Sequence, residues 1–194
     1  MLQVQLFEQT IANYYNAPYA VATDCCTHAI ELCLRLIKPK SVTCPNHTYL
    51  SIPMTFVKLN LDWNFVEEQW ANYYYIGNTN IIDAAVYFKE NSYIPNTLMC
   101  LSFQYKKHLN LGRGGMILLD SPNQALTLKK MSYDGREPNI PWADQNIDMI
   151  GYHYYMTPET AVEGILRFDR VKNKIPVKWS WQNYPNISLM KVFQ

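Results

Sequence analysis

Residues 102–115 of the chain read SFQYKKHLNLGRGG, and this stretch separates two apolar runs. Leu98–Leu101 precedes it, and Met116–Leu119 follows its final glycines. Short apolar runs bounded by turn residues are typical of buried strands. The sequence therefore predicts two buried strands joined by a polar loop, in which Ser102 stands five residues before Lys107.

Signals for helices and strands alternate along the rest of the chain. Apolar residues recur every three to four positions in residues 7–15 and 27–37, which predicts two amphipathic helices. Two more helices are predicted to begin at Ser121-Pro122 and Thr157-Pro158, because a hydroxyl cap followed by proline is a helix-start signal. Strands are predicted at residues 19–23, 41–44, 61–65, 80–84, 98–103, 116–119 and, as an edge strand, 177–181. This alternation predicts an α/β fold with a mostly parallel sheet sandwiched by helices.

Composition narrows the class of protein. The 194 residues are 48% hydrophobic, which suffices for one substantial core. The net charge of +1 shows no basic bias, so we expect no nucleic-acid partner. The sequence has no apolar run of about 18 residues and no basic segment followed by an apolar one at its start, so we expect no membrane span, no secretory signal and a cytoplasmic location. The five cysteines are then expected to be reduced thiols.

Five segments, taken in chain order, resemble the DegT/DnrJ/StrS aminotransferases, which use pyridoxal 5'-phosphate (PLP) to aminate nucleotide-linked keto sugars. The segments are AVATDCCTHAI (20–30), CPNHTY (44–49), NIIDAAV (80–86), SFQYKKHLNLGRGG (102–115) and GYHYYMTPETA (151–161). The resemblance extends from Phe7 to about Arg170 and implies a shortened form of the type I fold of PLP-dependent transferases. It implies a PLP-binding domain over residues 1–172, followed by a tail, residues 173–194, that is the remnant of a largely missing C-terminal domain.

The resemblance assigns the chemistry to two residues. Lys107 matches the lysine that holds PLP as a Schiff base and then serves as general acid and base. Asp83 matches the carboxylate that keeps the pyridine nitrogen protonated, which makes the cofactor an electron sink. The resemblance thus implies a ping-pong aminotransferase with an amino-acid donor, glutamate as is usual in the family, and a nucleotide-sugar acceptor.

The resemblance also assigns the residues that bind the cofactor. Those that would seat the phosphate within one subunit are Cys26, Thr27, His28 and Ser102. The first three begin a predicted helix, where free N–H groups and the helix dipole favour an anion. Tyr49 matches the aromatic residue that lies on the pyridine ring. His153 holds the place of an asparagine that reaches the phosphate of the neighbouring subunit, so we expect a homodimer with a shared active site.

Several positions depart from the family's pattern, and two alternative interpretations stay open. The departures are Cys26 for glycine, Ile82 for glutamate, Val86 for the residue that contacts the ring hydroxyl, Gln104 for histidine and Arg113 for glutamate. The first alternative is a degenerate member that binds PLP or a partner without turnover. The second is a zinc-binding protein, because Cys44 and His47 stand at ligand spacing. Its ligands would be drawn from Cys25, Cys26, His28, Cys44 and His47.

Overall fold

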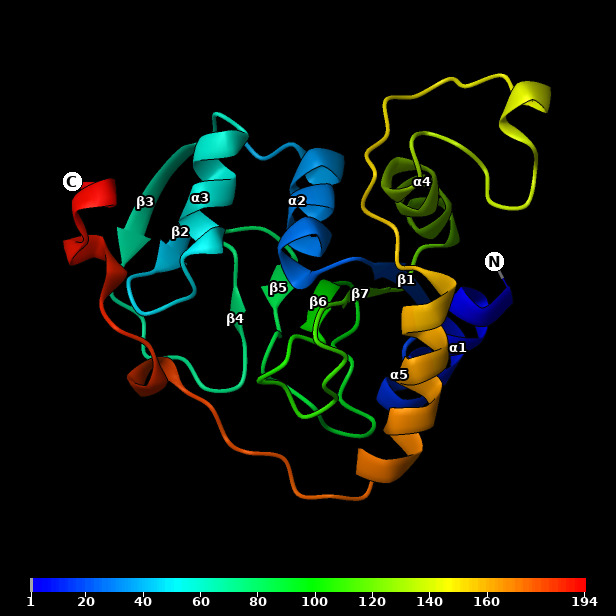
Figure 1. Ribbon diagram of the computed structural model, residues 1–194. Coiled ribbons are helices and arrows are strands. Elements are labelled where there is room, and N and C mark those ends of the chain that lie inside the picture. Colours follow the sequence, from blue (N-terminus) through cyan, green and yellow to red (C-terminus); the bar gives the residue numbers. More distant parts are fainter. Residues whose placement is uncertain (1) are drawn as a thin grey trace.

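The computed structural model describes residues 2–194, which form a five-stranded sheet, a separate pair of strands and helices on both faces of the main sheet (Figure 1). The α-helices are α1 Leu2–Tyr15, α2 Cys26–Ile37, α3 Ser51–Lys58, α4 Pro122–Ser132 and α5 Pro158–Val171. The strands are β1 Tyr19–Thr23, β2 Ser41–Pro45, β3 Asp62–Val66, β4 Tyr74–Tyr75, β5 Ile81–Asp83, β6 Leu98–Ser102 and β7 Gly115–Leu119. Short 3-10 helices follow at η1 Trp142–Asp144, η2 Trp181–Asn183, η3 Ile187–Leu189 and η4 Lys191–Phe193.

The main sheet has the strand order β1-β7-β6-β5-β4, and β2 pairs with β3 apart from it. The α/β class is confirmed, but the sheet is mixed where a mostly parallel one was expected. β5 and β6 are parallel, as are β2 and β3, while β7 runs antiparallel to both β1 and β6 and β4 runs antiparallel to β5. Two of the antiparallel pairs, β4–β5 and β6–β7, join consecutive strands through a loop, which allows the chain to return in the opposite direction.

Alternate residues of β7 face opposite layers of the molecule. Ile117 and Leu119 pack into the core shared with α2 and α4, whereas Met116 and Leu118 pack into the core shared with α1 and α5. This alternation follows from the two-residue period of a strand. Because all four side chains are fully buried, each contributes about 1.5–3 kcal/mol to folding. The expected sandwich of a sheet between helices is therefore present.

Both predicted helix-start signals operate as expected. The Ser121 side chain accepts a hydrogen bond from the Gln124 N–H over 3.3 Å, and proline follows it at the start of α4. Thr157 accepts from the Thr160 N–H, also over 3.3 Å, at the start of α5. Each bond satisfies one of the N–H groups that a helix leaves free in its first turn.

The tail that follows α5 differs from the expected edge strand. In Figure 1 it runs below the main sheet, from α5 toward β2 and β3. Its β-pairing with the preceding chain is one isolated bridge between Ala71 and Ser180. On either side of the bridge, the Asn72 N–H donates to the Trp179 carbonyl over 2.9 Å, and the Trp181 N–H donates to the Trp70 carbonyl over 3.1 Å. The chain then turns into η2, so no regular strand forms. No helix within residues 2–194 has the length and apolar character needed to cross a membrane.

Candidate active site

The carboxyl ends of β1, β5 and β6 meet at one edge of the sheet, because these three strands run in the same direction. Groups that follow such strand ends converge on a crevice. A cavity of about 570 Å³ lies there. The predicted site residues that line it are Cys26, Thr27, Tyr49, Asp83, Ser102 and Lys107. Residues predicted from four of the five segments are thus brought together, whereas the side chains of His28 and His153 are not part of the lining.

Asp83 ends β5 and presents a buried carboxylate to the cavity. Its Oδ2 accepts a hydrogen bond from the Tyr74 hydroxyl over 2.6 Å, and its Oδ1 accepts one from the Ala85 N–H over 3.0 Å. Burial raises the pKa of Asp83, while these two donors and the nearby Lys107 oppose that rise. The site therefore holds a carboxylate with a donor on each oxygen and its remaining lone pairs available to a ligand.

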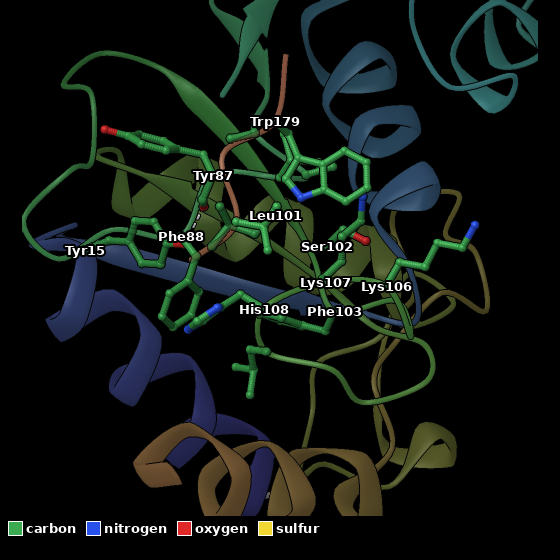
Figure 2. A pocket seen from close by; sticks show the side chains of 15 residues that line it. Tyr15, Tyr87, Phe88, Leu101, Ser102, Phe103, Lys106, Lys107, His108 and Trp179 are labelled. Carbon is green, nitrogen blue, oxygen red and sulfur yellow. Dashed lines mark hydrogen bonds between the residues drawn. The ribbon is translucent and has the colours of Figure 1, made fainter. Parts of the chain in front are cut away.

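Lys107 lies in the loop after β6, half-buried between the cavity and the tail. Figure 2 shows it beside Ser102 and the Trp179 ring, in the lining of a smaller cavity of about 130 Å³. Burial lowers the pKa of Lys107, and the charge of Asp83 partly opposes this shift. The neighbouring Lys106 is exposed. A buried amine with a lowered pKa is the form of lysine that acts as nucleophile and base.

The start of α2 forms one end of the cavity. The N–H groups of Cys26, Thr27 and His28 precede the first helical hydrogen bond, which the Ala29 N–H makes to the Cys25 carbonyl. The Thr27 hydroxyl donates to the Ser51 hydroxyl over 2.8 Å, and both residues line the cavity. Free N–H groups and hydroxyls at a helix N-terminus make a site for an anion.

Gly115 allows the strand β7 to lie against this helix start. A Cβ atom at position 115 would come within 2.5 Å of the Cys25 carbonyl carbon and 2.6 Å of the Cys26 nitrogen, so only glycine fits there. Cys26 itself is buried as the first residue of α2 and is not among the residues with positive φ. The replacement of the family's glycine by Cys26 therefore requires no left-handed backbone.

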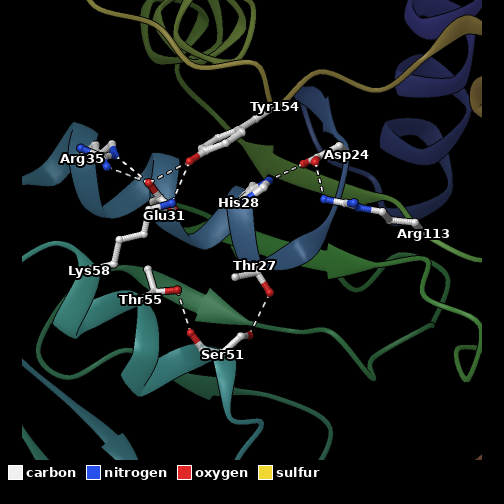
Figure 3. A network of polar contacts seen from close by, with 10 residues as sticks. All are labelled: Asp24, Thr27, His28, Glu31, Arg35, Ser51, Thr55, Lys58, Arg113 and Tyr154. Carbon is white, nitrogen blue, oxygen red and sulfur yellow. Dashed lines mark hydrogen bonds and ion pairs between the residues drawn. The ribbon is translucent and has the colours of Figure 1, made fainter.

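The His28 side chain points away from the cavity and stacks on Tyr154, with ring centroids 3.6 Å apart (Figure 3). Its Nδ1 hydrogen bonds to Asp24 over 2.7 Å, and Arg113 donates to the other oxygen of Asp24, also over 2.7 Å. Burial alone lowers the pKa of His28, but the hydrogen bonds to Asp24 and Cys25 raise it to about 9. The predicted contribution of His28 to the site is thus confined to its backbone N–H.

His153 lies outside the cavity lining and hydrogen bonds to Asp134 over 3.1 Å. Its side chain is 70% exposed. The structure therefore does not bring His153 to the site of its own chain, and its role toward a second subunit stays a prediction.

The zinc set expected in the alternative interpretation does not come together. Within residues 2–194, the residues close enough to share an ion are Asp24, Cys25 and His28, without Cys44 or His47. Cys44 is buried, and burial raises the pKa of its thiol to about 12. His47 hydrogen bonds to the Tyr184 carbonyl over 2.7 Å instead.

Sequence reasoning missed several residues of the cavity wall. They are Thr48, Ser51, Trp70, Tyr74, Trp179, Asn183 and Tyr184. Thr48 belongs to the segment CPNHTY (44–49), which resembles the family. The tryptophans of the tail, Trp179 and Trp181, could have indicated an aromatic surface. The contact of Tyr74 with Asp83 had no signal in the sequence, because it depends on the pairing of two very short strands.

The donor set of the cavity fits PLP. A helix N-terminus and two hydroxyls suit a phosphate, the buried Asp83 carboxylate suits a protonated ring nitrogen, and the Lys107 amine suits an aldehyde. Tyr49, which is 57% exposed at the cavity wall, offers a face to a flat ring. Val86 also lines the cavity, so at that position an apolar group stands where the family has a polar one.

Comparison with known proteins gives one family and one fold. A model of the DegT/DnrJ/EryC1/StrS aminotransferase family matches residues 2–86 and 95–184. No curated protein matches the sequence. Among solved structures, the chain is similar to AtS13 from Actinomadura melliaura, with a TM-score of 0.77 and 16% identity over 88% of this chain and 60% of that one.

Two further solved structures share the fold. One is a putative PLP-dependent aminotransferase from Bacillus cereus, with a TM-score of 0.74 and 17% identity over 89% of this chain and 59% of that one. The other is the PLP form of the putative sugar aminotransferase Spr1654 from Streptococcus pneumoniae, with a TM-score of 0.73 and 16% identity over 87% of this chain and 59% of that one. The chain thus has the expected fold and spans about 60% of the length of these proteins.

Proposed function

This chain belongs to the DegT/DnrJ/EryC1/StrS aminotransferase family, and we propose that it binds PLP and transfers an amino group from an amino acid to a keto sugar. The observation that carries the proposal is the meeting of the Asp83 carboxylate, the Lys107 amine and the start of α2 around one cavity. Each of these groups suits a different part of the same cofactor.

Different residues of the cavity would bind different parts of the cofactor. The N–H groups of Cys26, Thr27 and His28, with the hydroxyls of Thr27 and Ser102, would hold the phosphate. Tyr49 would pack on the ring. Because Asp24 carries a negative charge next to this end of the cavity, its pairing with Arg113 and His28 keeps that charge from repelling a phosphate.

Lys107 and Asp83 would perform the chemistry. PLP, when bound, withdraws electrons from the substrate carbon that carries the amino group. Asp83 would hold a proton on the ring nitrogen, since its free lone pairs face the cavity. Lys107 would bind the aldehyde carbon through its amine and later carry a proton between substrate atoms. Its lowered pKa favours the neutral amine that both tasks need.

We extend the proposal to the substrates. The donor is an amino acid, most simply glutamate, and the acceptor is a nucleotide-linked keto sugar. The resemblance of the five segments supports this choice. The two would react in turn by ping-pong, because donor and acceptor both need the single amine of Lys107 and the same cavity.

We also propose the assembly and the division of the chain. Residues 1–172 would form the PLP-binding domain, and the tail, residues 173–194, would be the remnant of a second domain. Trp179, Asn183 and Tyr184 support a role of this tail as a cavity wall. A second copy of the chain would complete the site with its exposed His153.

Binding without turnover is the second candidate function. The observation that favours it is Val86, an apolar lining residue that cannot hydrogen bond to the ring hydroxyl of PLP. A single half-reaction distinguishes the two candidates. Protein loaded with PLP is mixed with excess glutamate, and 2-oxoglutarate is measured. An aminotransferase yields about one equivalent per site, whereas a binding protein yields none, and Lys107→Ala provides the blank.

A further inference from the structure

Three buried groups form a chain of hydrogen bonds that ends on Asp83. The Tyr74 hydroxyl donates to Asp83 Oδ2 over 2.6 Å, and the Thr48 hydroxyl hydrogen bonds to the same Tyr74 oxygen. Thr48, Tyr74 and Asp83 are 2%, 4% and 7% exposed, so most of the surface of these groups is removed from water. Hydrogen bonds to a charged group in such surroundings are among the stronger ones in proteins.

The fold holds Tyr74 in this position from two sides. Tyr74 and Asp83 are direct partners in the β4–β5 pair, so their side chains lie on the same face of the sheet. The Tyr74 ring also packs against Trp70, with ring centroids 5.2 Å apart. Tyr74 is thus constrained by the backbone and by its neighbour, and the carboxylate that it contacts is constrained in turn.

The direction of the chain follows from counting protons. A tyrosine hydroxyl has one proton, and Tyr74 gives it to Asp83. Its oxygen must then accept the proton of Thr48, which fixes the order Thr48 to Tyr74 to Asp83. With the Ala85 N–H on the other carboxylate oxygen, Asp83 receives only donors from the protein, as an ionised carboxylate requires.

We propose that Tyr74, supported by Thr48, is a positioning residue that keeps Asp83 ionised and aims its free lone pairs at the ring nitrogen of the cofactor. This inference rests on the proposed function. It gives a role to Tyr74 and Thr48, in addition to the roles already proposed for Asp83, Lys107, Ser102, Tyr49 and the start of α2. Tyr74 suits the task because its proton stays in place, whereas the amine of Lys107 is used in the reaction.

Other titratable groups near Asp83 do not replace this donor. They are Lys107 in the loop after β6, Cys26 in α2, Cys44 in β2, Cys100 in β6 and Tyr184 in the tail. Burial raises the pKa of the thiols of Cys26, Cys44 and Cys100, so they stay neutral and add no positive charge. Lys107 is the one basic group of this set, and burial lowers its pKa.

The decisive variant is Tyr74→Phe, which keeps the ring and removes one hydroxyl. Tyr75→Phe is the matched control, because Tyr75 is the next residue of β4 and is 41% exposed. We expect Tyr74→Phe to weaken PLP binding about tenfold, which is the usual loss for one hydrogen bond to a charged group. In an Asp83→Asn background the same change should cost less than about twofold, because the charge that it supports is gone.

A second measurement does not depend on PLP. In the cofactor-free protein, carbon NMR of the Asp83 carboxyl should show titration at higher pH in Tyr74→Phe than in the wild type, and no change in Tyr75→Phe. Thr48→Val should shift the titration in the same direction by less, and it replaces Tyr74→Phe if that variant does not fold. Wild-type protein that fails to bind PLP would contradict the proposed function, while the titration would still judge the role of Tyr74. An Asp83 titration that is the same in all variants would overturn the inference.

Discussion

The Lys107 ammonium nitrogen lies 5.8 Å from the centre of the Trp179 ring, which comes from the tail of the chain. Both residues line the smaller cavity in Figure 2, and Trp179 also lines the larger one. The tail therefore shields the amine that the proposed chemistry uses. Burial is the main cause of the lowered pKa of Lys107, so the shield and the reactivity of the lysine are connected.

Removal of this shield gives the first prediction. Trp179→Ala should admit water to Lys107 and raise its pKa, because less burial disfavours the charged form less. The rate at which an amine-selective acylating reagent modifies Lys107 should then rise at higher pH than in the wild type. Trp142→Ala is the control, since Trp142 is 69% exposed and lines neither cavity. Equal pH profiles in wild type and Trp179→Ala would show that the tail does not set the state of the lysine.

The second prediction concerns the charge of Asp83. Asp83→Asn keeps the shape of the side chain and removes the charge that would hold a proton on the ring nitrogen. Amino transfer should fall by more than about a hundredfold, roughly 2.7 kcal/mol of transition-state stabilisation. PLP affinity should fall less, because the phosphate contacts at α2 are unchanged. Stopped-flow measurement of the half-reaction checks this, and a loss below about tenfold would remove Asp83 from the proposed chemistry.

The third prediction follows from the raised pKa of His28. A group whose pKa is raised on folding stabilises the protein at pH below its unfolded value, and this contribution disappears as the pH rises through the folded value. Burial opposes the shift and Asp24 causes it, with a result of about 9. His28→Gln should therefore cost roughly 1 kcal/mol at pH 6, allowing for solvent screening of a partly exposed pair, and almost nothing near pH 10.

Urea denaturation of wild type and His28→Gln at both pH values measures this difference. Asp24, Cys25 and Arg113 face His28, and all three are kept in the variant. A loss of stability that is the same at both pH values would assign His28 a packing role on Tyr154 alone.

The fourth prediction concerns the second subunit. If His153 reaches the phosphate of a partner, His153→Ala should weaken PLP binding about tenfold without changing the dimer, and His153→Asn should restore much of the loss. Sedimentation combined with PLP titration measures both quantities. A monomer that binds PLP tightly would contradict the shared site, whereas a dimer in which His153→Ala binds PLP as the wild type does would remove only the role of His153.

The strands of the site could be predicted closely from the sequence, and the reason is local. β1, β6 and β7 are short apolar runs with turn residues at their ends, and their observed bounds lie within one residue of the expected ones. Helices α4 and α5 were marked by a hydroxyl cap and a proline. Helix α3 carries no such mark, because Leu50 stands at its N-cap position and provides no capping side chain.

The rest of the site depends on contacts between distant segments. The Tyr74–Asp83 bond requires the β4–β5 pairing, and β4 has only two residues, too few to show a period. The place of Trp179 above Lys107 depends on the path of a tail that makes a single bridge to the chain. Motif resemblance predicted several of the residues that line the cavity, but it gave no information on the residues that support them.

Reductive trapping tests the central claim most directly. Protein incubated with PLP is treated with borohydride, digested and mapped by mass spectrometry, with Lys106→Ala and Lys107→Ala treated in parallel. The account predicts a phosphopyridoxyl group on Lys107 in the wild type and in Lys106→Ala, and none in Lys107→Ala, because Lys107 lies half-buried at the cavity beside Asp83 while Lys106 is exposed. A label on Lys106, or no label on either lysine, would contradict it.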